Sequence, residues 1–127
     1  MRKISPHVQI YKFPITAISS IATRVSGFGL TGLFVGFGIL SHFKKEDLLI
    51  KEYEKLSLPY KKAISYTLLT PTVYHTLGGI RHFIWDKYPK MFLNNKAAPR
   101  SSIIMFGLTL PLTFISEKFI KYWKKIF

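Results

Sequence analysis

The sequence predicts an all-α fold: a bundle of three transmembrane helices with a short interfacial helix. Three stretches of this 127-residue chain contain no Asp, Glu, Lys or Arg, namely 25–42, 63–80 and 101–116. A helix that crosses the hydrocarbon core needs about 20 mostly apolar residues, and shorter stretches suffice when flanking lysines extend toward the headgroups. Lysines lie between the three stretches. We therefore expect one membrane domain over residues 1–127.

The first predicted membrane helix covers about 14–42 and follows an N-terminal arm over 1–13. Pro14 is suited to the first turn of a helix, because the N–H that proline lacks would have no acceptor there. Gly32 and Gly36 are spaced as in membrane helices that allow another helix to approach closely. This glycine content favours a helix in lipid over a soluble one.

The other elements follow from charge and turn residues. Residues 43–62 carry both signs of charge with interspersed leucines, which predicts a short amphipathic helix at the membrane surface; a solvated loop is the alternative. The second membrane helix is expected over about 63–83. A connection containing prolines and two asparagines precedes the third, over about 101–120.

Composition excludes several classes of function. The chain has no cysteine, so it cannot form a disulfide, ligate an iron–sulfur cluster or attach haem covalently. Its net charge of +13 lies mostly in the connections between apolar stretches, which indicates attraction to lipid headgroups rather than to nucleic acid. The chain also lacks the paired carboxylates, activated nucleophile or phosphate loop that hydrolysis or group transfer needs.

The second apolar stretch contains the first candidate site. His75 lies at membrane depth, where an ionisable side chain is costly and usually functional, and neutral imidazole is a good ligand for iron. Gly79 and His82 share its helical face, and Gly79 would leave a flat patch for a porphyrin edge. His82 and Arg81, near the helix end, would pair with haem propionates. The alternative is that His75 bonds another helix and His82 extends to the interface.

A haem b site usually has two axial imidazoles. The other two histidines are His42, near the opposite membrane surface, and His7, in the arm. Neither easily reaches the depth of His75, so the second ligand is expected from another chain.

The second candidate site is a polar stripe on the first membrane helix. Thr16, Ser20, Thr23, Arg24 and Gly27 recur at helical spacing. A hydroxyl at position 20 and a guanidinium one turn later would bind the carbonyl oxygens of a quinone, and the arginine would stabilise developing negative charge. The alternative is that Arg24 anchors the helix to headgroups and Ser20 bonds its own backbone.

Two motifs resemble one known family. Residues 5–11 (SPHVQIY), Pro14, Ser20 and 24–27 (RVSG) resemble the first signature of the cytochrome b large membrane-anchor subunit of succinate dehydrogenase, respiratory complex II. Residues 75–82 (HTLGGIRH) with 85–86 (WD) resemble its second signature. Both occur in the family's order and separation, and together they cover about a third of the chain.

The resemblance implies a function in electron transport and the tricarboxylic acid cycle. Three membrane helices would pack against a smaller anchor subunit, with haem b shared between the two and His75 as the axial ligand from this chain. Ser20 and Arg24 would line the ubiquinone site, beside the iron–sulfur subunit. Succinate oxidation would belong to the flavoprotein and iron–sulfur subunits, with none of it in this chain. The family commonly has a histidine that approaches a propionate where this chain has Thr23.

The resemblance also implies the mitochondrial inner membrane, with the N-terminus toward the matrix; a bacterial inner membrane is the alternative. The sequence allows two alternative functions. A non-redox accessory or assembly subunit of a respiratory complex shares the hydropathy but leaves His75 and Arg24 unexplained. A soluble nucleic-acid binder would have to bury three apolar stretches in a very small fold.

Overall fold

The computed structural model describes residues 12–126, with side chains described as far as Trp123, and this part of the chain is helical between short connections. The helices are α2 (Ile15–His42), α3 (Glu46–Lys55), α4 (Leu58–Lys87), α5 (Pro89–Phe92) and α6 (Ala97–Ile126). The predicted all-α fold class is confirmed over these residues. Residues 1–11 of the predicted arm lie outside the described part.

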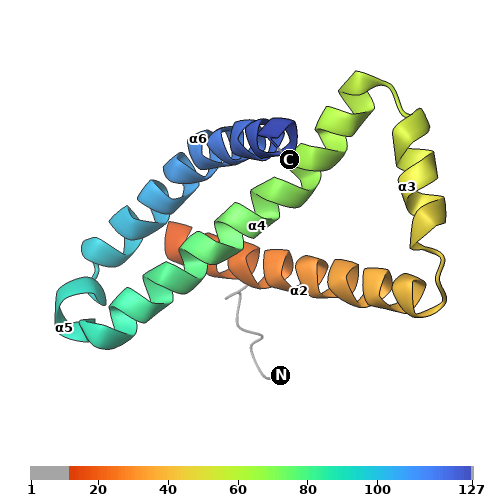
Figure 1. The fold of residues 1–127 in the computed structure, drawn as a ribbon. Coiled ribbons are helices and arrows are strands. Elements are labelled where there is room, and N and C mark those ends of the chain that lie inside the picture. The colour runs from red at the N-terminus through yellow and green to blue at the C-terminus, as the bar shows by residue number, and fades with distance from the viewer. Residues whose placement is uncertain (1–11, 127) are drawn as a thin grey trace, which may run out of the picture.

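Three long helices meet at one end of the molecule (Figure 1). α4 contacts both α2 and α6, and α2 also contacts α6. The first half of α2 crosses α4, and α6 runs back beside the C-terminal half of α4 after the short turn of α5. Beyond the crossing, α2 and α4 diverge, and α3 connects their far ends.

Two helices are long and apolar enough to cross a membrane by length and composition alone, Ile15–His42 and Ala97–Trp123. α4 does not meet the same hydropathy criterion, although its 30 residues span about 45 Å. Its central segment is uncharged but contains four threonines and two tyrosines, which lower its hydropathy. The second predicted span, over about 63–83, therefore stays a prediction.

The second and third long helices extend beyond the predicted apolar segments. α4 begins at Leu58 and ends at Lys87, and α6 begins at Ala97 and reaches Ile126. The additional turns contain several lysines and arginines, which are good helix formers that hydropathy does not detect. The apolar segment of each helix is thus shorter than the helix itself.

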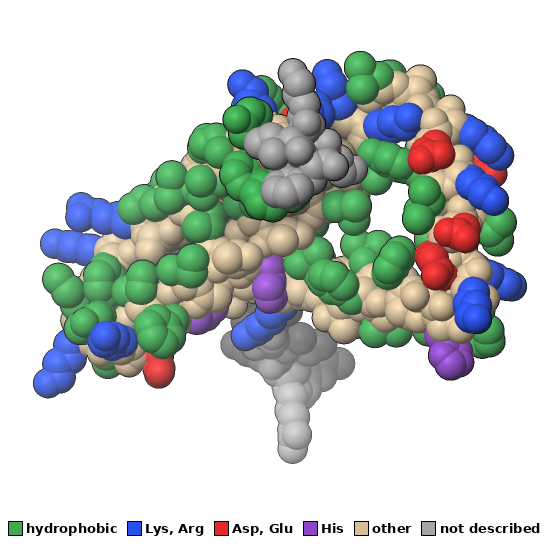
Figure 2. All heavy atoms as spheres, in the orientation of Figure 1, with side chains coloured by type: hydrophobic (Ala, Val, Ile, Leu, Met, Phe, Trp, Pro, Cys, Tyr) green, Lys and Arg blue, Asp and Glu red, His purple; other side chains and the backbone are tan. Residues whose placement is uncertain are grey.

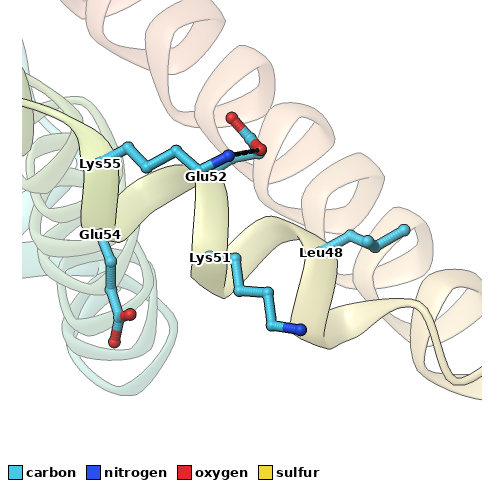
Figure 3. Close-up of a pocket in the computed structure, with 5 residues that line it drawn as sticks. All are labelled: Leu48, Lys51, Glu52, Glu54 and Lys55. Atoms are coloured by element: carbon cyan, nitrogen blue, oxygen red, sulfur yellow. Dashed lines mark hydrogen bonds and ion pairs between the residues drawn. The ribbon is translucent and has the colours of Figure 1, made fainter.

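α3 is a helix, so the loop interpretation is wrong for residues 46–55. Glu46 and Asp47 lie in its first turn and Lys55 in its last, which complements the helix dipole. Figure 3 shows a shallow hollow on α3, where Lys55 Nζ lies 2.6 Å from Glu52 Oε1. Both signs of charge line this hollow, so it favours no charged ligand.

Candidate functional site

The meeting point of α2, α4 and α6 is a buried polar cluster, which we call the polar junction. It consists of Ser19, Thr23, Tyr74, Arg81 and Ser102, none of which is more than 8% exposed. Tyr74 Oη donates a hydrogen bond to the Ser19 carbonyl oxygen at 3.1 Å. In an apolar surrounding such groups are costly unless hydrogen-bonded, so the cluster fixes how the three helices meet.

Arg81 connects the helices of the polar junction. Its Nη1 donates to Ser19 Oγ on α2 at 2.8 Å and to Ser102 Oγ on α6 at 3.0 Å. Its Cζ lies 4.6 Å from the centroid of the Trp85 ring, within the range of a cation–π contact. Nε and Nη2 are buried and have no hydrogen-bond partner among the described residues.

Two glycines allow α2 and α4 to approach at the polar junction. A Cβ added at Gly78 would lie 2.6 Å from Thr23 Cγ2, and one added at Gly27 would lie 2.5 Å from His75 Cε1. A side chain larger than hydrogen at Gly78 or Gly27 would therefore displace Thr23 or His75. A Cβ at Gly32 or Gly36 would meet nothing within 4 Å, so no helix of the described chain uses that pair.

His75 lies against α2 beside Gly27. Its Nδ1 is 3.0 Å from the Thr23 carbonyl oxygen. A carbonyl oxygen only accepts, so Nδ1 carries the proton and donates it. Nε2 then holds the lone pair and has no hydrogen-bond partner within the described chain. Part of the side chain is exposed.

This arrangement fits an axial haem ligand. Histidines that bind metals almost always donate the other ring N–H to a carbonyl or carboxylate, which fixes the tautomer and orients the ring. One turn later, Gly79 is exposed, and a Cβ added there would meet nothing within 4 Å. His75 thus has an oriented lone pair beside an open patch of helix backbone.

The other residues expected near a haem lie on two different faces of α4. His82 is exposed, like His75 and Gly79, and its ring packs edge-on against Trp85 with centroids 5.5 Å apart. Arg81 instead points into the polar junction and is 6% exposed. Its pairing with a haem propionate stays a prediction, for which Nε and Nη2 remain available donors.

The predicted polar stripe on α2 is divided between two environments. Thr23 is buried, and its Oγ1 donates to the Ser19 carbonyl oxygen at 2.9 Å. Ser20 is half-buried and Arg24 is exposed, one turn apart. Neither side chain forms a hydrogen bond or ion pair within residues 12–126, so both are free to contact a ligand or another subunit.

Sequence reasoning did not identify Ser19 and Ser102. The available signal was Arg81, because a cation deep between apolar helices requires hydrogen-bond acceptors on its neighbours. Each neighbouring helix supplies one hydroxyl, on Ser19 and Ser102. The sequence alone did not show which of the many serines and threonines would face it.

Comparison with known proteins gives a consistent family. Residues 1–115 match the model of the succinate dehydrogenase/fumarate reductase transmembrane subunit. The mitochondrial succinate dehydrogenase cytochrome b560 subunit of Dictyostelium discoideum is 37% identical over 123 residues, which are 90% of this chain and 62% of that protein. The chain therefore spans less than two thirds of that relative.

The match to this chain covers a larger share of two further relatives. The succinate dehydrogenase cytochrome b560 subunit of Reclinomonas americana is 34% identical over 124 residues, 91% of this chain and 83% of the relative. The cytochrome b556 subunit of Paracoccus denitrificans is 25% identical over 131 residues, 90% of this chain and 93% of the relative. The two motifs predicted this assignment, and the chain belongs to the family of cytochrome b membrane-anchor subunits of succinate dehydrogenase.

Proposed function

We propose that this chain binds haem b through His75, shares it with a smaller anchor subunit, and forms part of the site where ubiquinone is reduced. Electrons would come from succinate through the flavoprotein and iron–sulfur subunits. α2, α4 and α6 would each span the inner membrane, with the N-terminus toward the matrix. The relatives' names support a succinate dehydrogenase subunit, found in both mitochondria and a bacterium.

The geometry of His75 carries the haem proposal. Donation from Nδ1 to the Thr23 carbonyl and contact with Gly27 hold the imidazole in one orientation. The ring would need no reorganisation to present Nε2, and the open backbone at Gly79 leaves space beside it. Bound there, haem b would supply a one-electron carrier within the membrane.

His75→Ala in the intact complex tests this proposal. We expect the reduced-minus-oxidised haem spectrum to disappear or shift, because the iron loses one axial ligand. Succinate-dependent reduction of an artificial dye by the soluble subunits should persist. His42→Ala, at the far end of α2, is the matched control and should leave the spectrum unchanged. An unaltered spectrum in His75→Ala would exclude this residue as the ligand.

Ser20 and Arg24 carry the quinone proposal. They lie one turn apart on the half of α2 that packs against α4 and α6, and they have no partners within the described chain. A hydroxyl and a guanidinium can donate to quinone oxygens, and the cation stabilises charge that develops there. Burial of the neighbouring Ser19 fixes the rotation of this helix.

Arg24→Leu and Ser20→Ala should reduce succinate–ubiquinone activity more than succinate–dye activity. Loss of one charge-assisted donor costs about 10²–10³ in rate where it acts on the transition state, so Arg24→Leu should have the larger effect. Lys62→Leu, which removes an exposed cation from another helix, is the control. Equal loss of both activities would instead indicate failed assembly.

A further inference from the structure

We propose that the groove between α4 and α6 binds one anionic phospholipid, with its phosphate at Lys96 and Arg100 and an acyl chain between the helices. The groove consists of two adjoining hollows of opposite character. It goes beyond the haem and quinone sites, and it shares with the proposed function only the membrane location of α4 and α6.

The inner part of the groove is apolar. It has a volume of about 220 Å³ and lies on the face of α4 opposite His75. Its walls are mostly aliphatic and aromatic side chains: Leu77, Ile80, Ile84, Trp85, Phe92, Ile104, Met105 and Leu108, with Arg81 and Ser101. An acyl chain can pack against such walls, because it has no polar group that needs a hydrogen bond.

The outer part is polar and basic. A hollow of about 440 Å³ adjoins the groove and shares Phe92, Ser101 and Ile104 with it. Asn94, Lys96, Ala97 and Arg100 complete its lining. Within residues 12–126 neither the Lys96 nor the Arg100 side chain forms a hydrogen bond or ion pair. The Lys96 and Ala97 amides are already bound to Asn94 Oδ1, so the two side chains are the donors for a ligand.

The charge around this hollow favours an anion. Residues 86–100 contain four cations and a single carboxylate, Asp86. Figure 2 shows Lys and Arg side chains projecting at this end of the molecule with one acidic side chain among them, whereas at the other end, around α3, several acidic side chains mix with basic ones. Basic side chains at a membrane surface attract anionic lipids by about 1 kcal/mol each.

The length of the groove matches one leaflet. From Ala97, in the basic hollow, to Leu108, at the inner end of the groove, α6 rises by about 16 Å. Half of a hydrocarbon core is about 15 Å thick. A phosphate at Lys96 and Arg100 would thus place an acyl chain along the whole apolar groove. This match favours a lipid over a small soluble anion.

Native mass spectrometry of the detergent-purified complex tests the proposal, with phosphatidylglycerol and phosphatidylcholine added in equal amounts. We expect on the order of tenfold preferential retention of one phosphatidylglycerol, because its headgroup is a net anion facing two cations, whereas the choline cation makes phosphatidylcholine neutral overall. The double variant Lys96→Gln/Arg100→Gln should lose this preference. Lys45→Gln/Lys62→Gln removes the same charge at the opposite end of the molecule and should keep it.

A second variant and a crosslink test the groove itself. Ile104→Trp fills the apolar part and should reduce retention of both lipids. A photoreactive residue at position 104 should crosslink to lipid. Crosslinking to another subunit, equal retention of the two lipids, or an unchanged preference in Lys96→Gln/Arg100→Gln would each overturn the proposal. The haem spectrum of the same samples reports separately on the proposed function.

Discussion

The two halves of α2 use small residues in opposite ways. In the first half, Ser19, Thr23 and Gly27 face α4 and α6, and their size lets the helices meet at the polar junction. In the second half, a Cβ at Gly29, Gly32, Gly36 or Gly38 would meet nothing within 4 Å. Glycine therefore marks a contact within the chain in the first half of α2 and an open face in the second half.

The open half of α2 has apolar surface that the described chain does not cover. Phe34 is 74% exposed and Val35 is 56% exposed. A hollow of about 560 Å³ is lined by this half of α2 together with Leu49 of α3 and Leu68 and Thr72 of α4. Figure 2 shows hydrophobic side chains around this region. In lipid, close packing by small residues drives helix association, so this face suits the smaller anchor subunit that we propose.

Adding one methyl group at a glycine should give the largest difference in stability between the two halves of α2. In Gly27→Ala the new Cβ would lie 2.5 Å from His75 Cε1, so the imidazole must move and its bond to the Thr23 carbonyl must lengthen. We expect a loss of about 1–3 kcal/mol of stability, as for overpacked cores, together with weaker haem retention. Thermal unfolding of the complex followed at the haem band measures both.

Gly29→Ala is the matched control, because it makes the same change where nothing lies within 4 Å. Alanine has a higher helix propensity than glycine, so this variant should be neutral or slightly stabilised. If Gly29→Ala lost as much stability as Gly27→Ala, the difference between the two halves of α2 would not exist.

The sequence predicted the helices better than the contacts between them. Charge-free stretches identified the long helices, because that signal is local, whereas the role of His75 in the HTLGGIRH motif as a haem ligand stays a prediction. The contacts of Arg81 and the use of Gly27 and Gly78 depend on the rotation and crossing of the helices. Periodicity fixes which residues share a face, but not which face meets a neighbour. The spacing of Gly32 and Gly36 therefore predicted a face for close helix packing, but not which helix packs against it.

Gly78→Ala should affect the haem band less than Gly27→Ala, because its Cβ would meet Thr23 and not His75. Its Cβ would meet Thr23 Cγ2 at 2.6 Å and Oγ1 at 2.9 Å, and threonine cannot easily rotate away because its hydroxyl is bound to the Ser19 carbonyl. We expect a loss of about 1–2 kcal/mol, measured by thermal unfolding of the complex. Gly107→Ala, in open space on α6, is the control.

A second substitution sharpens this prediction. Thr23→Ser removes Cγ2 while keeping a hydroxyl for the Ser19 carbonyl. Thr23→Ser/Gly78→Ala should therefore recover part of the stability that Gly78→Ala loses, and the double-mutant cycle gives the coupling free energy. Strictly additive effects would show that the two side chains do not compete for the same space.

The smallest expected effect is at α6. Ser102→Ala removes one of the two hydroxyls that accept from Arg81 Nη1, while Ser19 Oγ remains at 2.8 Å. Hydrogen bonds between membrane helices contribute about 0.6 kcal/mol on average, so the complex should lose roughly that much stability. Ser101→Ala is the control, because the Ser101 hydroxyl bonds only the Ala98 carbonyl of its own helix. Equal losses in the two variants would mean that Arg81 does not hold α6 through Ser102, and the polar junction would then depend on α2 and α4 alone.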